Sequence, residues 1–257
     1  MAQQICQNCE AVVETWQRFC GSCGAVISRA PAGPVETLYF EADSTTGKAK
    51  LVVIRGDSTG ASYYLTGDEY LVGRTQGTIL FSDDTYVSPR HATFSYRDGK
   101  LLVADAGSHN GTYLRIRQPI PLRDGDTFLA GEEVLRFNLY RPSAKGASTD
   151  EEYCGTPLRP WRMQITQILD GGFEGIVHPS RRKSLTIGRE ACDVNFPLDR
   201  YMSGKHVRIE ERDGQFMLVD LDSRNGTFYR LTAGSEAPLQ NGDHVFVGRQ
   251  LLRVDII

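Results

Sequence analysis

The sequence predicts an all-β protein, with two β-sandwiches preceded by a small module that binds a metal through four cysteines. Three observations carry this prediction. Residues 73–112 align without a gap on residues 188–227, and 15 of the 40 aligned positions are identical. Short β-type segments alternate with turn sequences, and there is no amphipathic helical pattern of ten or more residues. Four of the six cysteines fall within the first 23 residues.

The composition excludes several classes of protein. The chain has 257 residues, of which 40% are hydrophobic and 24% charged, and its net charge is −3. These values exclude bulk disorder and a polybasic nucleic-acid binder as descriptions of the whole chain. No apolar run approaches the roughly 18 to 20 residues of a membrane helix, and the first residues lack the basic and apolar regions of a signal peptide. We therefore expect a cytoplasmic protein with no membrane partner.

The N-terminal cysteines have the spacing of a metal site. Two C-x2-C pairs are separated by ten residues, and four thiolates suit tetrahedral zinc. So short a segment buries too little apolar surface to fold alone, so metal binding would supply its folding free energy. The alternatives are two disulfides, which the missing signal peptide disfavours, and iron in the same site. We expect one structural Zn²⁺, held by Cys6, Cys9, Cys20 and Cys23 in residues 1–28, a pattern that resembles the small zinc ribbons of bacterial multidomain proteins.

Each repeat consists of short strands joined by turns. The offset of 115 residues between the copies is too long for a solenoid unit and fits two whole domains, at 50–140 and 161–257. Residues 29–49 and 141–160 are rich in residues typical of linkers, and we expect them to separate the three modules. In the first copy, the strands are expected at 51–54, 63–65, 70–72, 92–96, 101–104 and 134–139, between Arg-Asp-Gly, Asn-Gly and Asp-Gly-Asp turns.

The positions retained between the repeats are mostly polar and fall at predicted loops. In each copy an Arg ends a strand, a Ser follows 14 residues later, a His three residues after that, and an Asn 19 residues after the His. A guanidinium can hold a phosphate by two hydrogen bonds, a hydroxyl can donate to a phosphate oxygen, and a carboxamide can pair with a peptide backbone. Any one of these residues alone would be a solvated charge or a turn residue. Their joint repetition favours a binding site in each domain, built from Arg74, Ser88 and Asn110, and from Arg189, Ser203 and Asn225.

The order Gly-Arg, Ser-x-x-His and Asn-Gly-Thr, present twice, resembles the forkhead-associated (FHA) domain, a β-sandwich whose apical loops bind phosphothreonine peptides. The resemblance covers about 50–140 and 161–257 and implies two FHA-like sandwiches. It implies that the Arg and Ser of each copy hold the phosphate, and that the Asn bonds the ligand backbone just after the phosphothreonine. Neighbouring residues that would add phosphate contacts are Arg90 and His109 in the first copy, and Lys205 and Arg224 in the second. Structural motif residues would be Gly73, His91, Gly111 and Thr112, and Gly188, His206, Gly226 and Thr227.

The resemblance implies an adaptor in Ser/Thr-kinase-dependent signalling. Its partners would be threonine-phosphorylated proteins, made by a kinase acting in trans, and two sites on one chain would favour doubly phosphorylated partners. The second copy gathers more positive charge, with Arg181, Arg182 and Lys183 expected nearby, so we expect it to bind more tightly. It also departs from the family pattern: Asn195-Phe196-Pro197 replaces the usual acidic and aliphatic run, so its loop need not have the same shape.

The same residues allow other functions. Ser-x-x-His invites a hydrolase interpretation, but the chain has no Gly-x-Ser-x-Gly elbow, Walker A sequence, dinucleotide fingerprint or kinase motif, so we expect no enzyme. The alternatives are a phosphate-independent scaffold and a transcription-related adaptor acting through the zinc ribbon. No module is basic, so we do not expect nucleic acid as a partner.

The linkers contain threonines that a kinase could modify. Thr149 precedes Asp150-Glu151-Glu152, and Thr45 and Thr46 precede the first sandwich. Phosphorylated, either segment could dock into a site of the same chain and block it. The alternative is that they are solubilising linker residues.

Overall fold

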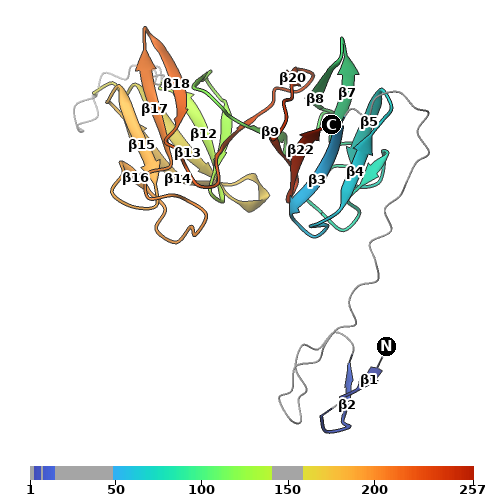
Figure 1. Cartoon of the computed structure of the whole chain (residues 1–257). Coiled ribbons are helices and arrows are strands. Elements are labelled where there is room, and N and C mark those ends of the chain that lie inside the picture. The colour runs from blue at the N-terminus through green and yellow to red at the C-terminus, as the bar shows by residue number, and fades with distance from the viewer. Residues whose placement is uncertain (1–2, 7, 15–48, 141–158) are drawn as a thin grey trace, which may run out of the picture. The chain divides into compact units, whose positions relative to one another are not determined.

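The computed structural model describes residues 3–6, 8–14, 49–140 and 159–257 (Figure 1). The chain divides into a unit over 1–41 and a unit over 42–257. In the first, β1 (Gln3–Ile5) and β2 (Val12–Glu14) form an antiparallel hairpin. Within the described ranges no helix has the length and hydrophobicity needed to cross a membrane. Residues named in the sequence predictions that lie outside the described ranges are Cys20, Cys23, Thr45, Thr46, Thr149 and the acidic run 150–152.

The larger unit confirms the all-β class. Within its described residues the regular secondary structure consists of strands, apart from the single 3-10 turn η1 (Asp170–Gly172). Buried and half-buried residues alternate along strands such as β3 (Ala49–Arg55), as expected when one strand face packs into a core. All the strand segments predicted in the first repeat lie within observed strands. The further strands of this repeat are β4 (Ser62–Leu65), β5 (Glu69–Gly73), β6 (Ile79–Leu80), β7 (Ala92–Arg97), β8 (Lys100–Asp105), β9 (Thr112–Arg115), β10 (Ile120–Pro121), β11 (Thr127–Ala130) and β12 (Glu133–Leu139).

The second repeat has the same order of strands. Its first two, β13 (Met163–Ile168) and β14 (Glu174–Ser180), form a hairpin with η1 at its tip. The remaining strands are β15 (Ser184–Gly188), β16 (Val194–Asn195), β17 (Val207–Arg212), β18 (Gln215–Asp220), β19 (Thr227–Arg230), β20 (Glu236–Pro238), β21 (His244–Val247) and β22 (Gln250–Ile256).

The two repeats exchange their last three strands. One 5-stranded sheet has the order β20-β8-β7-β5-β6, the other has the order β10-β18-β17-β15-β16, and a 10-stranded sheet runs β14-β13-β12-β11-β19-β9-β21-β22-β3-β4. The first sandwich thus consists of β3 to β9 with β20 to β22, and the second of β13 to β19 with β10 to β12. In Figure 1 the red β20 and β22 accordingly lie among the blue and green strands. The ranges 50–140 and 161–257 describe the sequence repeat, whereas each sandwich draws strands from both.

Each core mixes side chains from the two repeats. In the first sandwich, Leu252 and Val254 of β22 are buried against residues of β3 such as Leu51. In the second, Phe128 and Phe137 are buried with the side chains of β13, β15 and β17. Truncating a buried Phe to Ala costs about 3–5 kcal/mol, so the exchanged strands are integral parts of the sandwiches that receive them.

The exchange is reciprocal in its polar contacts as well. Asp84 of the first sandwich accepts a hydrogen bond from the backbone N–H of Arg249, at 2.8 Å, in the turn between β21 and β22. Asp199, its repeat equivalent, accepts one from the backbone N–H of Glu132, at 2.7 Å, in the turn between β11 and β12. Each buried carboxylate therefore holds a turn that belongs to the other repeat.

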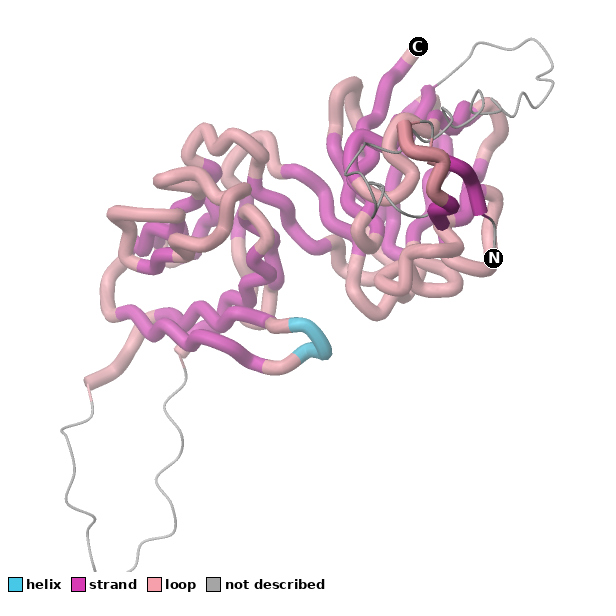
Figure 2. Tube along the Cα trace, turned by 90° about the horizontal axis from the view of Figure 1, so that it is seen from below, coloured by secondary structure: helices cyan, strands magenta, loops and turns pink. Residues whose placement is uncertain are grey.

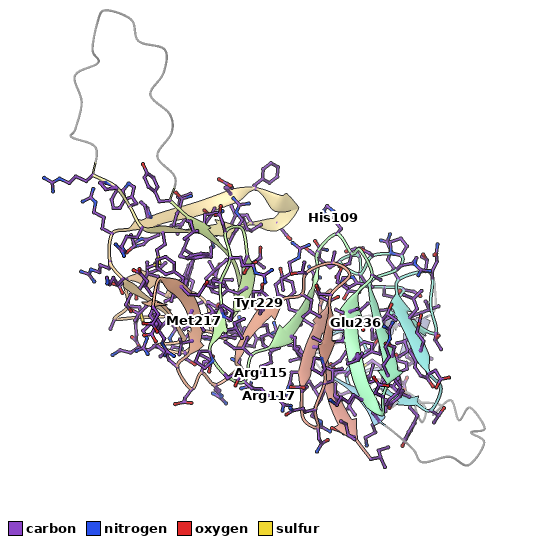
Figure 3. The ribbon with its side chains drawn as sticks, turned by 90° about the horizontal axis from the view of Figure 1, so that it is seen from above. His109, Arg115, Arg117, Met217, Tyr229 and Glu236 are labelled. Atoms are coloured by element: carbon purple, nitrogen blue, oxygen red, sulfur yellow. The ribbon has the colours of Figure 1, made fainter. Side chains whose placement is uncertain are left out.

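The two sandwiches meet where β9 pairs with β19. Leu114 lies opposite its repeat equivalent Tyr229, so the pairing is nearly symmetric. Beside it, the rings of Phe228 and Phe246 pack edge to face with centroids 4.8 Å apart, next to the buried Tyr113. In Figure 3, Arg115 and Tyr229 lie at this seam. The chain then crosses from β9 to β10 and from β19 to β20, through residues 116–119 and 231–235.

Candidate functional site

The residues selected from the repeat gather in the loops at the ends of three strands of each sandwich. In the first sandwich, Arg74 follows β5, Ser88 and Arg90 lie between β6 and β7, and His109 and Asn110 lie between β8 and β9. We call these five the first site. Their equivalents, which we call the second site, occupy the same loops of the second sandwich: Arg189, Ser203, Lys205, Arg224 and Asn225.

A backbone hydrogen bond joins the Arg loop to the Ser loop in each site. The N–H of Arg74 donates to the carbonyl of Ser88, and the N–H of Arg189 donates to that of Ser203, both at 2.9 Å. The preceding glycine permits this approach, because a Cβ on Gly73 would overlap the backbone carbonyl oxygen of Pro89 in the neighbouring loop and that of Gln76 in its own loop. This close packing explains why the sequence reads Gly-Arg at the end of the strand.

The serine hydroxyl connects the second loop to the third. Ser88 Oγ accepts a hydrogen bond from the backbone N–H of His109, and Ser203 Oγ accepts one from that of Arg224, each at 3.0 Å. A hydroxyl that accepts through its oxygen keeps its own proton to donate. Each serine is thereby fixed in position with a donor that a ligand can use.

The motif histidine braces these loops from inside. His91 is fully buried; the N–H of Ser88 donates to its Nδ1 at 3.0 Å, and its Nε2 lies 3.1 Å from the carbonyl of Gly111. Nδ1 therefore accepts, and Nε2 carries the proton and donates. Burial lowers the pKa of His91, and the same cause lowers the pKa of His206, which makes equivalent bonds. Both rings are neutral braces at neutral pH.

The asparagines are held at the rim of each site. Asn110 donates from Nδ2 to the carbonyl of Tyr86 at 2.8 Å, and Asn225 donates to the carbonyl of Tyr201 at 2.7 Å. Each bond uses one amide hydrogen of an exposed side chain. The carboxamide is thus oriented, and its oxygen and second hydrogen are suited to pairing with an extended peptide.

Sequence reasoning missed the carboxylate that organises the Asn-Gly-Thr turn. Asp105 accepts from Ser108 Oγ at 2.6 Å, from Thr112 Oγ1 at 2.9 Å, and from the N–H groups of Gly107 and Ser108. Burial acts to raise the pKa of Asp105, and the hydrogen bonds from Ser108, Thr112 and Gly107 outweigh it and lower that pKa. Asp220 holds Ser223 and Thr227 in the same way. The sequence does mark these residues, because the Asp and the Ser are each identical in the two copies of the repeat.

An arginine from the opposite repeat also supports each Asn-Gly-Thr turn. Arg230, at the end of β19, donates from Nη2 to the carbonyl of His109 at 3.1 Å, and its side chain lies where a Cβ on Gly111 would be. Arg115, at the end of β9, packs in the same way on Gly226. The two arginines are 115 residues apart and so equivalent in the repeat, although they lie just beyond the aligned segments 73–112 and 188–227.

Two expectations about the second site are corrected by the structure. Lys183 directly precedes β15 whereas Arg189 follows it, so Arg181 to Lys183 lie at the opposite end of this strand, where Lys183 is about 20 Å from Arg189 at 3.3 Å per residue. The altered run at 195–197 keeps the hydrogen bond that anchors this loop, because Phe196 donates its N–H to the carbonyl of Gly188 at 2.9 Å as Phe81 does to that of Gly73 at 3.0 Å.

The comparisons with known proteins agree with this architecture. The model of the FHA domain matches residues 70–131 and 185–248. The oxoglutarate dehydrogenase inhibitor of Corynebacterium diphtheriae is 41% identical over 103 residues, which cover 40% of this chain and 69% of that protein. The glycogen accumulation regulator GarA of Mycobacterium tuberculosis is 39% identical over 113 residues, covering 43% of this chain and 67% of its own length.

Among solved structures, one described as a structural and functional analysis of phosphothreonine-dependent FHA domain interactions is 29% identical. The match covers 37% of this chain and 97% of the solved chain, with a TM-score of 0.23. The family model matches each copy of the repeat, and the two relatives named above match over two thirds of their own length. This chain belongs to the FHA domain family, with two copies of the domain.

Proposed function

We propose that each sandwich binds a phosphothreonine-containing segment of a partner protein, one at the first site and one at the second. The observation that carries the proposal is the same set of bonds in both sandwiches, which brings a guanidinium, a hydroxyl and a carboxamide to one cluster of loops. Membership of the FHA family supports it.

Each group has a distinct role in this proposal. Arg74 holds the phosphate by two hydrogen bonds, and Ser88 donates its hydroxyl proton to a third oxygen. Arg90 and His109, both exposed, add donors at the rim. Asn110 pairs with the peptide backbone next to the phosphothreonine. The threonine methyl adds a small apolar contact, which selects against phosphoserine.

The histidine geometry favours binding over catalysis. His91 Nδ1 bonds the backbone N–H of Ser88, and its Nε2 bonds Gly111, so neither nitrogen serves as a base for the Ser88 hydroxyl. The two relatives described above are named as an inhibitor and a regulator. We infer a cytoplasmic adaptor that is not an enzyme and reads threonine phosphorylation placed on its partners by a Ser/Thr kinase in trans.

Titration of the full chain with phosphothreonine peptides tests the proposal. We expect wild type to bind two peptides, Arg74→Ala and Arg189→Ala to bind one each, and the double variant to bind none. Arg212→Ala is the matched control, because Arg212 is an exposed arginine at the end of β17 whose partner is Glu210. Equal binding of the unphosphorylated peptide would instead support the phosphate-independent scaffold.

A structural Zn²⁺ at the N-terminus is a second part of the proposal. Cys6 is buried in the turn after β1, and the N–H of Asn8 points to its Sγ at 3.5 Å. Donation of backbone N–H groups to a cysteine sulfur suits a metal-bound thiolate. Cys9 lies in the same turn, while Cys20 and Cys23 lie outside the described residues. Bound zinc would crosslink the two Cys pairs. Elemental analysis should find one zinc per chain, and none after Cys6→Ser with Cys9→Ser.

Docking of a phosphorylated linker into one of the sites remains a further proposal. It would involve Thr149, or Thr45 and Thr46, all outside the described residues. Kinase treatment should then weaken peptide binding by wild type and leave binding by a chain with these threonines changed to Ala unaltered. Unchanged binding by the treated wild type would argue against it.

A further inference from the structure

The hairpin β13–β14 of the second sandwich reaches the first site. Its tip, η1, carries Asp170, whose two carboxylate oxygens accept from the hydroxyl of Tyr86 at 2.9 and 3.1 Å. Tyr86 lies in the loop of Ser88, and its carbonyl is the group that Asn110 holds. One residue therefore joins the hairpin tip to the rim of the first site. Figure 2 shows η1 in cyan at the end of this hairpin.

The hairpin exposes an apolar surface that no described contact covers. Phe173 is 72% exposed and Ile176 56%, and the neighbouring Leu169 and Val177 are also exposed. Gly171 and Gly172 have φ values of 79° and 80°, which produce a tight turn after Asp170. Phe173 folds back over Gly171, with a ring carbon 2.9 Å from the position of a Cβ there. The turn thus holds Asp170 against Tyr86 while Phe173 stays at the surface.

In the described part of the chain, the corresponding turn beside the second site carries no large apolar side chain. At the second site, the end of β3 contacts Tyr201, the repeat equivalent of Tyr86. The Arg55 guanidinium lies 4.2 Å from the centre of the Tyr201 ring. The turn that follows, residues 56–61, reads Gly-Asp-Ser-Thr-Gly-Ala and has no large apolar side chain.

The contact of the β13–β14 tip with Tyr86 and the contact of Arg55 with Tyr201 both involve charged groups of each sign. Arg55 pairs with Glu132 at 3.5 Å. Tyr86 has Asp170 at its hydroxyl and the Arg249 guanidinium 4.1 Å from the centre of its ring. Each tyrosine thus has a cation over its ring, with a carboxylate on the Tyr86 hydroxyl in one case and on the Arg55 guanidinium in the other. The difference between the β13–β14 turn beside the first site and the β3–β4 turn beside the second is therefore apolar area.

We propose that the β13–β14 hairpin extends the first site, and that it takes an apolar side chain flanking the phosphothreonine of the bound segment. The proposal rests on the proposed function of the first site. An extended peptide advances about 3.3 Å per residue, so a few residues beyond the one held by Asn110 cover the length of Tyr86 and reach the hairpin. Burial of one Leu or Phe side chain is worth enough to change affinity about tenfold. Selection of the residue that flanks the phosphothreonine at the first site would then depend on a hairpin of the second sandwich.

The test uses full-length Arg189→Ala, in which only the first site responds, and phosphothreonine peptides that carry Leu or Ser at each flanking position in turn. We expect Leu at one position to tighten binding about three- to tenfold. This preference should vanish in Phe173→Ser and persist in Ile256→Ser, a matched change at an exposed apolar residue of β22. The chain with Arg74→Ala, which reports on the second site, should show no such preference.

Three outcomes would overturn the proposal: no preference for Leu, a preference that survives Phe173→Ser, or the same preference at the second site. A second copy of the chain could instead cover the hairpin, because β14 is an edge strand of the 10-stranded sheet. Sedimentation that shows a dimer lost in Phe173→Ser would also overturn the proposal. Failure of the proposed function looks different, since Arg74→Ala would then leave all phosphopeptide binding unchanged.

Discussion

Arg230 of the second repeat donates a hydrogen bond to the backbone carbonyl of His109 in the first repeat, at 3.1 Å. The acceptor belongs to the turn that carries Asn110, and the donor lies at the end of β19 in the other sandwich. Arg115 occupies the equivalent place beside Gly226. Each candidate site is therefore supported by an arginine from the opposite repeat.

This relationship predicts a crossed pattern of mutational effects. Arg230→Ala should weaken peptide binding at the first site about three- to tenfold, because the turn loses a charge-assisted hydrogen bond. Arg115→Ala should weaken the second site and spare the first. Calorimetric titration in the Arg189→Ala and Arg74→Ala backgrounds separates the sites. An effect of each arginine on the site of its own repeat would contradict the arrangement.

The two sites should differ in affinity because they differ in charge at one matched position. His109 precedes the Asn of the first site and Arg224 that of the second, and both side chains are exposed. His109→Arg should tighten phosphopeptide binding at the first site about three- to tenfold, and Arg224→His should weaken the second by a similar factor. The gain should shrink as salt is raised. No change in either variant would place this position outside phosphate contact.

Stability should fall as the pH drops from about 7 to 5. Burial lowers the pKa of His91 and His206 in the folded protein, so the unfolded chain binds protons at a higher pH than the folded one. Their contribution is fully present above the pKa of the unfolded state and is lost as the pH falls through the folded pKa. Denaturant unfolding at several pH values measures this.

Replacing both histidines by Gln should flatten that dependence and lower stability at neutral pH. Some dependence should persist, because burial also lowers the pKa of His244. An unaltered pH dependence in the double variant would show that these rings do not titrate on unfolding.

The local features of the fold were predictable from the sequence. The Gly-Arg, Ser-x-x-His and Asn-Gly-Thr motifs mark loops, and their equal spacing placed equivalent residues in equivalent positions. The predicted strands do not include β9, because its first residue, Thr112, belongs to the Asn-Gly-Thr motif, which predicts a turn. The role of Asp105 depends on side-chain hydrogen bonds to a turn, which spacing alone does not reveal.

The strand exchange could not be predicted from local pattern. The β11–β12 hairpin and the β21–β22 hairpin have similar sequences and similar partners, so either would complete either sandwich. Which sandwich receives them depends on where the segments 116–119 and 231–235 lead the chain. Side-chain periodicity is the same in both arrangements.

Cleavage of the chain between the repeats tests most directly the central claim, that each site lies in a sandwich built from both repeats. A protease site placed between 141 and 158, outside the described residues, would separate the two repeats covalently. Because β10 to β12 lie in one sandwich and β20 to β22 in the other, the two fragments should stay together through gel filtration. They should also still bind two phosphothreonine peptides. Separation into two folded halves, each binding one peptide, would contradict the account.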